Sequence, residues 1–170
     1  TLSRQAIEEL HRALDEAERR EDVKEVVITG EGDRFFSAGG DINEIAEFVL
    51  AGEDGRKAMS RSEKLNAAYE FSKRGQNLVL RLRKFPKPVT ALINGVCVGG
   101  GFELALGCHR RVATPNAIMG LPEVTLGIIP GWGGTRFLAK IVRVHDAGIF
   151  AGVLIRSAHS FSSREALYYQ

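Results

Sequence analysis

The feature that most constrains the fold is a run of glycines that follows a short aliphatic segment. Residues 89–93 read Val-Thr-Ala-Leu-Ile, and three consecutive glycines, Gly99–Gly101, come shortly after them. β-branched and aliphatic residues favour a strand, while glycines let the backbone approach a ligand without interference from a Cβ atom. We therefore expect a strand at 89–93 that ends in a glycine turn and leads directly into a short apolar helix reaching Cys108.

The start of this helix is a candidate site because its first amide groups have no partner within the helix. Such N–H groups and the helix dipole favour an anion, or an oxygen that becomes negative during a reaction. Glu103 lies just inside the helix, between Phe102 and Leu104. Apolar surroundings raise the pKa of an acid and suit it to proton transfer. The alternative is a tight strand-to-helix turn in which Glu103 only complements the dipole.

A second loop of small residues, Ala38-Gly39-Gly40-Asp41, precedes a helical pattern at 42–49. This loop can present backbone donors as the first one does, or it can be a plain connection into the helix. Gly30 and Gly32 begin a dinucleotide-binding fingerprint, but Phe35 occupies the position of its third glycine. A partial match of this kind is weak, so dinucleotide binding remains a distant alternative.

A third segment places another acid beside glycines. Glu123 also stands in an apolar frame, and residues 131–135 read Gly-Trp-Gly-Gly-Thr, which predicts a flexible turn into a helix near 137–141. Trp132 in this turn either narrows a pocket or packs as ordinary core. Glu123 lies 20 residues after Glu103, the other acid in an apolar frame.

The remaining pattern alternates helices with short strands. Apolar residues at steps of three and four predict a helix over 3–17, capped by its first serine, and a strand follows at 26–28. A helix before the first strand is an unusual start for an α/β domain, so we expect the chain to begin inside its domain. A long amphipathic helix is predicted from about Arg56 to Lys84, ended by Pro86 and Pro88.

Gly75 weakens the helical pattern of this long segment locally. Its apolar face is expected to be core and not a cofactor site, and consists of Leu65, Ala68, Phe71, Leu78 and Leu82. A short strand is expected at 112–114, a weaker helix at 144–154, and a last helix from Arg164.

Composition fits one domain over residues 1–170 and excludes several classes of function. A net charge of +2 with interleaved signs argues against nucleic-acid and membrane binding. The four histidines lack metal-ligand spacing, and no apolar run reaches the ~18 residues that span a bilayer. Cys97 and Cys108 lie in apolar segments of the chain, which is typical of buried free thiols. Free thiols persist in a reducing compartment, so a cytoplasmic protein is expected.

Three motifs, at residues 36–42, 87–108 and 121–135, occur in the order and spacing of a known family. Through them the chain resembles the enoyl-CoA hydratase (crotonase) superfamily. The resemblance implies an α/β fold, a spiral of repeated ββα units, with acyl-CoA bound between the loops. It also implies that the first strand or strands and the C-terminal trimerisation helices lie outside these residues, and that the full-length protein is a trimer or a dimer of trimers.

The resemblance assigns roles by motif position. Backbone N–H groups of Gly40 and Gly100 would form an oxyanion hole for the thioester, while Glu103 and Glu123 would hold the water in a hydratase. The substrate-binding residues it implies are Ala38, Gly40, Asp41, Ile42, Gly99, Gly100, Pro122 and Trp132. Neither a metal nor a cofactor is implied, since coenzyme A is part of the substrate.

The chain departs from the family pattern at two positions. His109 stands where relatives commonly have aspartate, and Asn43 stands where many have a lysine near the coenzyme A moiety. The leading hypothesis is hydration of trans-2-enoyl-CoA, of the fatty-acid β-oxidation type, in a protein that is alone or fused to a dehydrogenase. A Δ3-Δ2 enoyl-CoA isomerase and a catalytically silent acyl-CoA-binding subunit are the alternatives.

Overall fold

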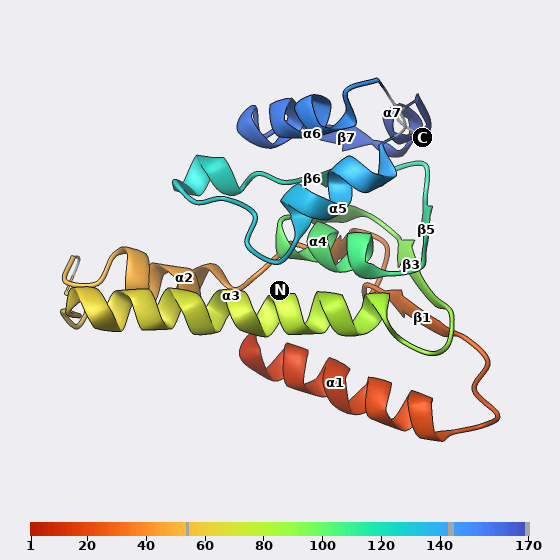
Figure 1. Cartoon of the computed structure of the whole chain (residues 1–170), viewed down its shortest axis with the longest axis horizontal. Helices are drawn as coiled ribbons and strands as arrows, with labels where there is room; N and C mark the ends of the chain where they lie inside the picture. The colour runs from red at the N-terminus through yellow and green to blue at the C-terminus, as the bar shows by residue number, and fades with distance from the viewer. Residues whose placement is uncertain (54, 143–144, 169–170) are drawn as a thin grey trace.

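The computed structural model describes residues 1–53, 55–142 and 145–168 as a mixed α/β fold (Figure 1). Its first half contains α1 (Arg4–Arg19), β1 (Val26–Thr29), β2 (Phe35–Ser37), α2 (Ile42–Val49), α3 (Arg61–Arg83), β3 (Val89–Ile93) and β4 (Val96–Val98). Its second half contains α4 (Gly100–Gly107), β5 (Arg110–Ala113), β6 (Ile118–Gly120), the 3-10 helix η1 (Glu123–Leu126), α5 (Gly134–Ile141), α6 (Ala147–Arg156), β7 (Ser160–Ser162) and α7 (Ser163–Tyr168).

The strands form two sheets, and the chain visits them alternately. One sheet has the order β1-β3-β5 and is parallel, with Val26 opposite Val89 and Thr90 opposite Arg110. The other has the order β2-β4-β6-β7, in which only β7 runs antiparallel. Two strands, one in each sheet, are followed by helical structure three times along the chain. This arrangement is the repeated ββα spiral expected from the sequence.

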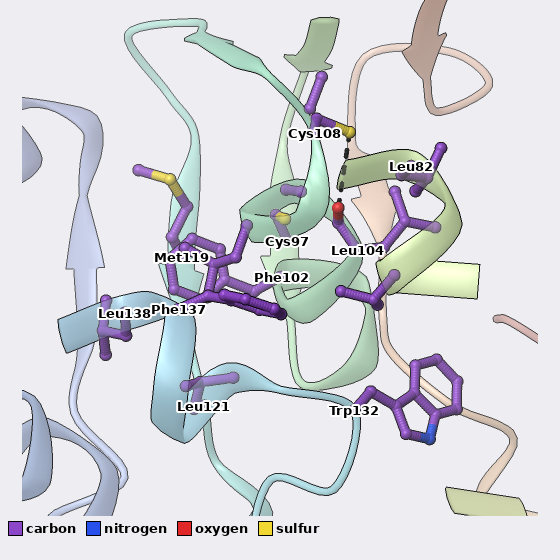
Figure 2. Close-up of a cluster of buried hydrophobic side chains, with 14 of the residues drawn as sticks. Leu82, Cys97, Phe102, Leu104, Cys108, Met119, Leu121, Trp132, Phe137 and Leu138 are labelled. Carbon is purple, nitrogen blue, oxygen red and sulfur yellow. Dashed lines mark hydrogen bonds between the residues drawn. The ribbon is translucent and has the colours of Figure 1, made fainter. Parts of the chain in front are cut away.

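The core is built around α4, because every residue of this helix is buried. Figure 2 shows apolar side chains from several elements gathered there, with Leu82 from α3, Phe137 and Leu138 from α5, and Met119 from β6. Cys97 and Cys108 are both buried and unpaired, and the Cys108 thiol donates to the Leu104 carbonyl at 3.5 Å. Burial raises the pKa of both thiols, which confirms the prediction that they lie in apolar surroundings.

The long helix α3 lies between α1 and α4 (Figure 1). Ser3 caps α1 by accepting the amide of Ala6, and Ile7 of α1 is buried. At the other end of α1, the Lys87 ammonium donates to three carbonyls, those of Ala17, Glu18 and Arg20. A cation at this end also complements the negative end of the helix dipole.

Two boundaries predicted from the sequence are wrong. The long helix begins at Arg61 and not near Arg56, because Ser60 and Glu63 form a reciprocal capping box that fixes its first turn. The strand at 89–93 does not lead directly into the apolar helix, since β4 intervenes and pairs with β2 and β6. Gly75, which weakened the helical pattern, lies within an uninterrupted helix.

The expected core face of α3 is only partly core. Leu78 and Leu82 are fully buried, as predicted, whereas Leu65 is 61% exposed. Ala68 and Phe71 line a cavity. The predicted strand at 112–114 is β5, which ends one residue earlier, and the predicted 144–154 helix is α6, which starts at Ala147; Val144 itself lies outside the described residues.

The prediction of a last helix near Arg164 is confirmed by α7, which starts one residue earlier at Ser163. None of the helices in the described part of the chain is long and apolar enough to cross a bilayer.

Candidate active site

A cavity of about 730 Å³ brings the three sequence motifs together. From the first motif it is lined by Ala38, Gly39, Gly40 and Ile42; from the second by Val98, Gly99, Gly100 and Glu103; and from the third by Pro122, Glu123, Gly131 and Trp132. All but one of the residues that the resemblance assigned to substrate binding or catalysis therefore face one space. The exception is Asp41, whose carboxylate caps α2 by accepting the Asn43 amide at 2.9 Å.

The two glycine loops approach each other closely at this cavity. A Cβ atom placed on Gly39 would lie 3.1 Å from the Val98 carbonyl oxygen and 3.3 Å from the Gly100 nitrogen. Gly39 and Gly99 both have positive φ, +95° and +55°, which side chains rarely tolerate. Glycine is therefore required here both for the contact between the loops and for their backbone conformation.

This conformation leaves two amide groups for a ligand. The Gly100 amide is the first of α4 and so has no partner within the helix. The Gly40 amide precedes the α2 cap, and no hydrogen bond among residues 1–53, 55–142 and 145–168 uses it. Both glycines line the cavity, so the loops can present two donors to one oxygen.

Glu103 is almost completely buried on α4, at 2% exposure. Its Oε1 atom accepts two backbone hydrogen bonds, from the Trp132 amide at 2.8 Å and from the Gly134 amide at 2.7 Å. Burial raises the pKa of Glu103 to about 7, although these N–H groups oppose the rise by stabilising the carboxylate. The side chain is thus held in one orientation and titrates near neutral pH.

Glu123, at the start of η1, is also buried, but its surroundings differ. Neither of its side-chain oxygens has a hydrogen-bond partner among the described residues. Burial raises its pKa to about 7, and the nearby charge of Glu103 adds to the rise. An ionised carboxylate that is buried without hydrogen-bond partners costs free energy, so these surroundings favour the protonated form of Glu123. Raised pKa values at two acids in one cleft are a frequent property of catalytic sites.

A second cavity of similar volume is lined by residues such as Phe102, Leu106 and Arg111. Its lining contains guanidinium and hydroxyl groups but, within the described residues, no carboxyl group. The acid pair and the two glycine amides therefore single out the first cavity as the candidate active site.

Sequence reasoning did not identify the aromatic residues on the wall that α2 and α3 contribute. Phe48 and Phe71 lie on this wall, and their ring centroids are 6.0 Å apart. Glu44 of α2 forms an ion pair with Arg74 of α3, whose guanidinium also lies over the Phe71 ring. Phe71 had been assigned to the core because helical periodicity cannot separate a core face from a pocket wall.

Trp132 lines the cavity and is 3% exposed. Its ring packs against Phe71 with the centroids 5.5 Å apart, and Figure 2 shows it at the edge of the apolar cluster. The Gln76 amide donates to the Gly131 carbonyl at 2.6 Å and so fixes the preceding residue to α3. Trp132 is thus both a packing residue and part of the pocket lining, the two alternatives considered from sequence.

Of the two departures from the family pattern, His109 makes a side-chain contact, while Asn43 contributes its backbone to a helix cap. His109 accepts the Val89 amide on its Nδ1 atom at 3.0 Å and so holds the start of β3. Asn43 donates its own backbone amide to Asp41 in the α2 cap. Across the part of the chain that the structure describes, no three histidine, cysteine or acidic side chains gather as a metal site would require.

Comparison with known proteins agrees with this geometry. The family model described as enoyl-CoA hydratase/isomerase matches residues 1–168. The chain is 42% identical over 166 residues to a probable enoyl-CoA hydratase from Bacillus subtilis (strain 168) and 36% identical over 166 residues to a short-chain-enoyl-CoA hydratase from Clostridium acetobutylicum. The chain belongs to the enoyl-CoA hydratase/isomerase family.

A solved structure supports the same assignment. The crystal structure of an enoyl-CoA hydratase from Bacillus anthracis superimposes with a TM-score of 0.81 at 33% identity, over 99% of this chain and 58% of that one. The two bacterial relatives are matched over 98% of this chain but over 57% and 56% of their own lengths. The chain thus spans a little over half the length of these three relatives.

Proposed function

We propose that the protein hydrates trans-2-enoyl-CoA thioesters to 3-hydroxyacyl-CoA. The observation that carries the proposal is the pairing of Glu103 and Glu123, two buried acids with raised pKa values, in one cavity with two available glycine amides. The hydratase names of the relatives support the same chemistry. The reaction needs no cofactor, because the thioester itself activates the double bond.

In this proposal the amides of Gly40 and Gly100 bind the thioester oxygen. Addition of water to C3 moves negative charge from the double bond onto that oxygen, so the two donors are used most strongly in the transition state. One donor of this kind is typically worth about 3 kcal/mol in a site that excludes water. Their placement on glycine loops lets the carbonyl approach without a side chain in its path.

The environments of the two acids suggest which is the base. Glu103 accepts two backbone N–H groups, which favour its carboxylate form, so it takes the proton from the attacking water. Glu123 has no such donors and interacts with the charge of Glu103, so it carries the proton that goes to C2. The water oxygen bonds to C3, and the substrate gains one proton and one hydroxyl group.

Two other functions remain as alternatives. A Δ3-Δ2 isomerase needs to move only one proton and therefore needs only one of the two acids. A silent acyl-CoA-binding subunit would use the glycine loops without turnover. The retention of two buried acids favours hydration over both. We further propose that the protein is a cytoplasmic homo-oligomer, as its resemblance to the family and its buried thiols suggest. Light scattering of the purified protein tests the oligomeric state.

The functions are separated by incubating the protein with 2-butenoyl-CoA and, separately, with 3-butenoyl-CoA. Hydration predicts loss of the enoyl-thioester absorbance and a product heavier by one water. An isomerase would instead convert 3-butenoyl-CoA to 2-butenoyl-CoA with no change of mass. Calorimetric binding of the thioester with neither reaction would identify a binding subunit, and binding of NAD would support the dinucleotide alternative.

A further inference from the structure

Trp132 occupies a space bounded by three glycines from three separate elements. A Cβ atom placed on Gly75 of α3 would lie 2.0 Å from the Cδ2 atom of the indole, and one placed on Gly100 would lie 2.6 Å from Cζ3. At Gly40 the corresponding distance to Cη2 is 3.5 Å, an ordinary contact. The ring therefore fills the volume that side chains at Gly75 and Gly100 would need.

The ring consequently contacts every group that the proposed mechanism uses to hold the thioester. It touches Gly40 and Gly100, whose amides are the proposed donors, on one side and α3 on the other. The Trp132 backbone amide donates to Glu103, and its ring also packs on Phe71, whose Cζ lies 2.9 Å from a Cβ placed on Gly40. Contacts on so many sides leave the indole little room to move.

We infer that Trp132 is a positioning residue, and that Gly75 is glycine because the indole packs directly on its backbone. The ring transmits the position of α3 to both glycine loops and so sets the separation of the Gly40 and Gly100 amides. This inference rests on the proposed function for its effect on rate. The contact between the ring and Gly75 stands apart from that function and can be measured separately.

The sharpest test adds one methyl group behind the ring. Gly75→Ala would force the indole toward the glycine loops, and a displacement of about 1 Å in an active site can lower the rate by about a hundredfold. We expect kcat for 2-butenoyl-CoA to fall by about that factor while KM changes little, because the thioester still enters the cavity. Gly152→Ala in α6 is the matched control, since a Cβ at that helical glycine meets no atom within 4 Å.

Removing the ring should make the added methyl harmless. In the double variant Gly75→Ala/Trp132→Ala, kcat should be at least as high as in Trp132→Ala alone, because the Cγ, Cδ2 and Cε2 atoms that the added methyl would meet are absent, so the two changes are non-additive. Trp132→Ala alone, or Trp132→Phe if Gly75→Ala does not fold, should lower kcat with little change in KM. Wild-type kcat in Gly75→Ala or in both Trp132 variants would overturn the inference, as would a further loss in the double variant.

Fluorescence gives a readout that does not depend on turnover. Trp132 is the only tryptophan in the chain, so its emission reports the environment of this ring. Gly75→Ala should shift the emission and Gly152→Ala should not. If the wild-type protein hydrates no enoyl-CoA but the emission shifts, the proposed function fails and the packing of the ring on Gly75 stands. If the wild type is active and Gly75→Ala changes neither kcat nor emission, the inference fails alone.

Discussion

In the proposed mechanism, two identical side chains, Glu103 and Glu123, have different tasks. Both are buried in one cavity, but only Glu103 accepts backbone N–H groups. Replacing Glu123 by glutamine keeps the shape of the side chain and removes the transferable proton. We therefore expect Glu123→Gln to lower kcat by about 10²–10⁴ while KM changes little, as measured by steady-state hydration of 2-butenoyl-CoA. Glu8→Gln, at an exposed position of α1 outside the cavity lining, is the control and should retain kcat within a few-fold.

The rate of hydration should depend on pH in a bell shape centred near neutrality. Glu103 must be ionised to act as base, so activity rises as pH increases through its pKa of about 7. Glu123 must be protonated to act as acid, so activity falls as pH rises through its own pKa, also about 7. The two limbs belong to the pair and not to one residue. A value of kcat/KM that stays constant between pH 5 and pH 9 would contradict this assignment of base and acid.

The pH dependence of the free energy of unfolding should reveal what it costs to bury Glu123. Its pKa is about 7 in the folded protein and near 4.5 in an unfolded chain, so the unfolded chain releases the proton first as pH rises. Folding stability is therefore lost between those two pH values and stays reduced above pH 7, by an amount on the order of 3 kcal/mol. Glu123→Gln should raise the free energy of unfolding at pH 8 and have little effect at pH 4. An equal effect at both pH values would show that ionisation is not the cause.

At the scale of single elements, the junction between α1 and β3 depends on one lysine. The partly buried Lys87 ammonium donates to three carbonyls at the end of α1, whereas Lys84 is exposed. Lys87→Met should lower the free energy of unfolding by about 1–2 kcal/mol, measured by urea denaturation, because it leaves helix carbonyls without a donor. Lys84→Met should be neutral, and equal losses in the two variants would refute this role.

The elements also explain what could be predicted from the sequence. Long amphipathic segments such as α1 were found from their periodicity, and the glycine loops were found because few other residues permit such backbone approach. The three-residue strands β2, β4 and β6 were missed because three residues show no periodicity, and only pairing with neighbouring strands of the same sheet defines them. For the same reason the sequence predicts a turn where β4 lies.

Some residues of the candidate site could likewise be predicted from the sequence, and others could not. Glu103 and Glu123 were found because acids in apolar segments are rare enough to stand out. Phe48 and Phe71 were missed because an aromatic residue on a helix face looks the same whether it faces the core or a cavity. The start of α3 at Arg61 was knowable in principle, since Ser60 and Glu63 have the spacing of a capping box. The role of Gly75 could not be predicted from the sequence, because Trp132, which packs on it, is distant along the chain.

At the scale of the whole molecule, the site exists only when distant parts of the chain fold together. Gly40 and Phe71 come from the first ββα unit of the spiral, Gly100 from the second and Glu123 from the third. We therefore expect activity, far-ultraviolet circular dichroism and Trp132 fluorescence to be lost at one denaturant concentration, as in a two-state transition. Loss of activity well before the loss of secondary structure would show that the site unfolds as a separate unit.

The central claim is that Glu103 and Glu123 together add water to an enoyl thioester. The most direct test compares initial rates of 2-butenoyl-CoA hydration for the wild-type protein and for the double variant Glu103→Gln/Glu123→Gln, with thioester binding to each measured by calorimetry. The account predicts that the wild type forms the 3-hydroxy product and that the double variant binds the thioester but forms almost none. Full hydration by the double variant would contradict the claim.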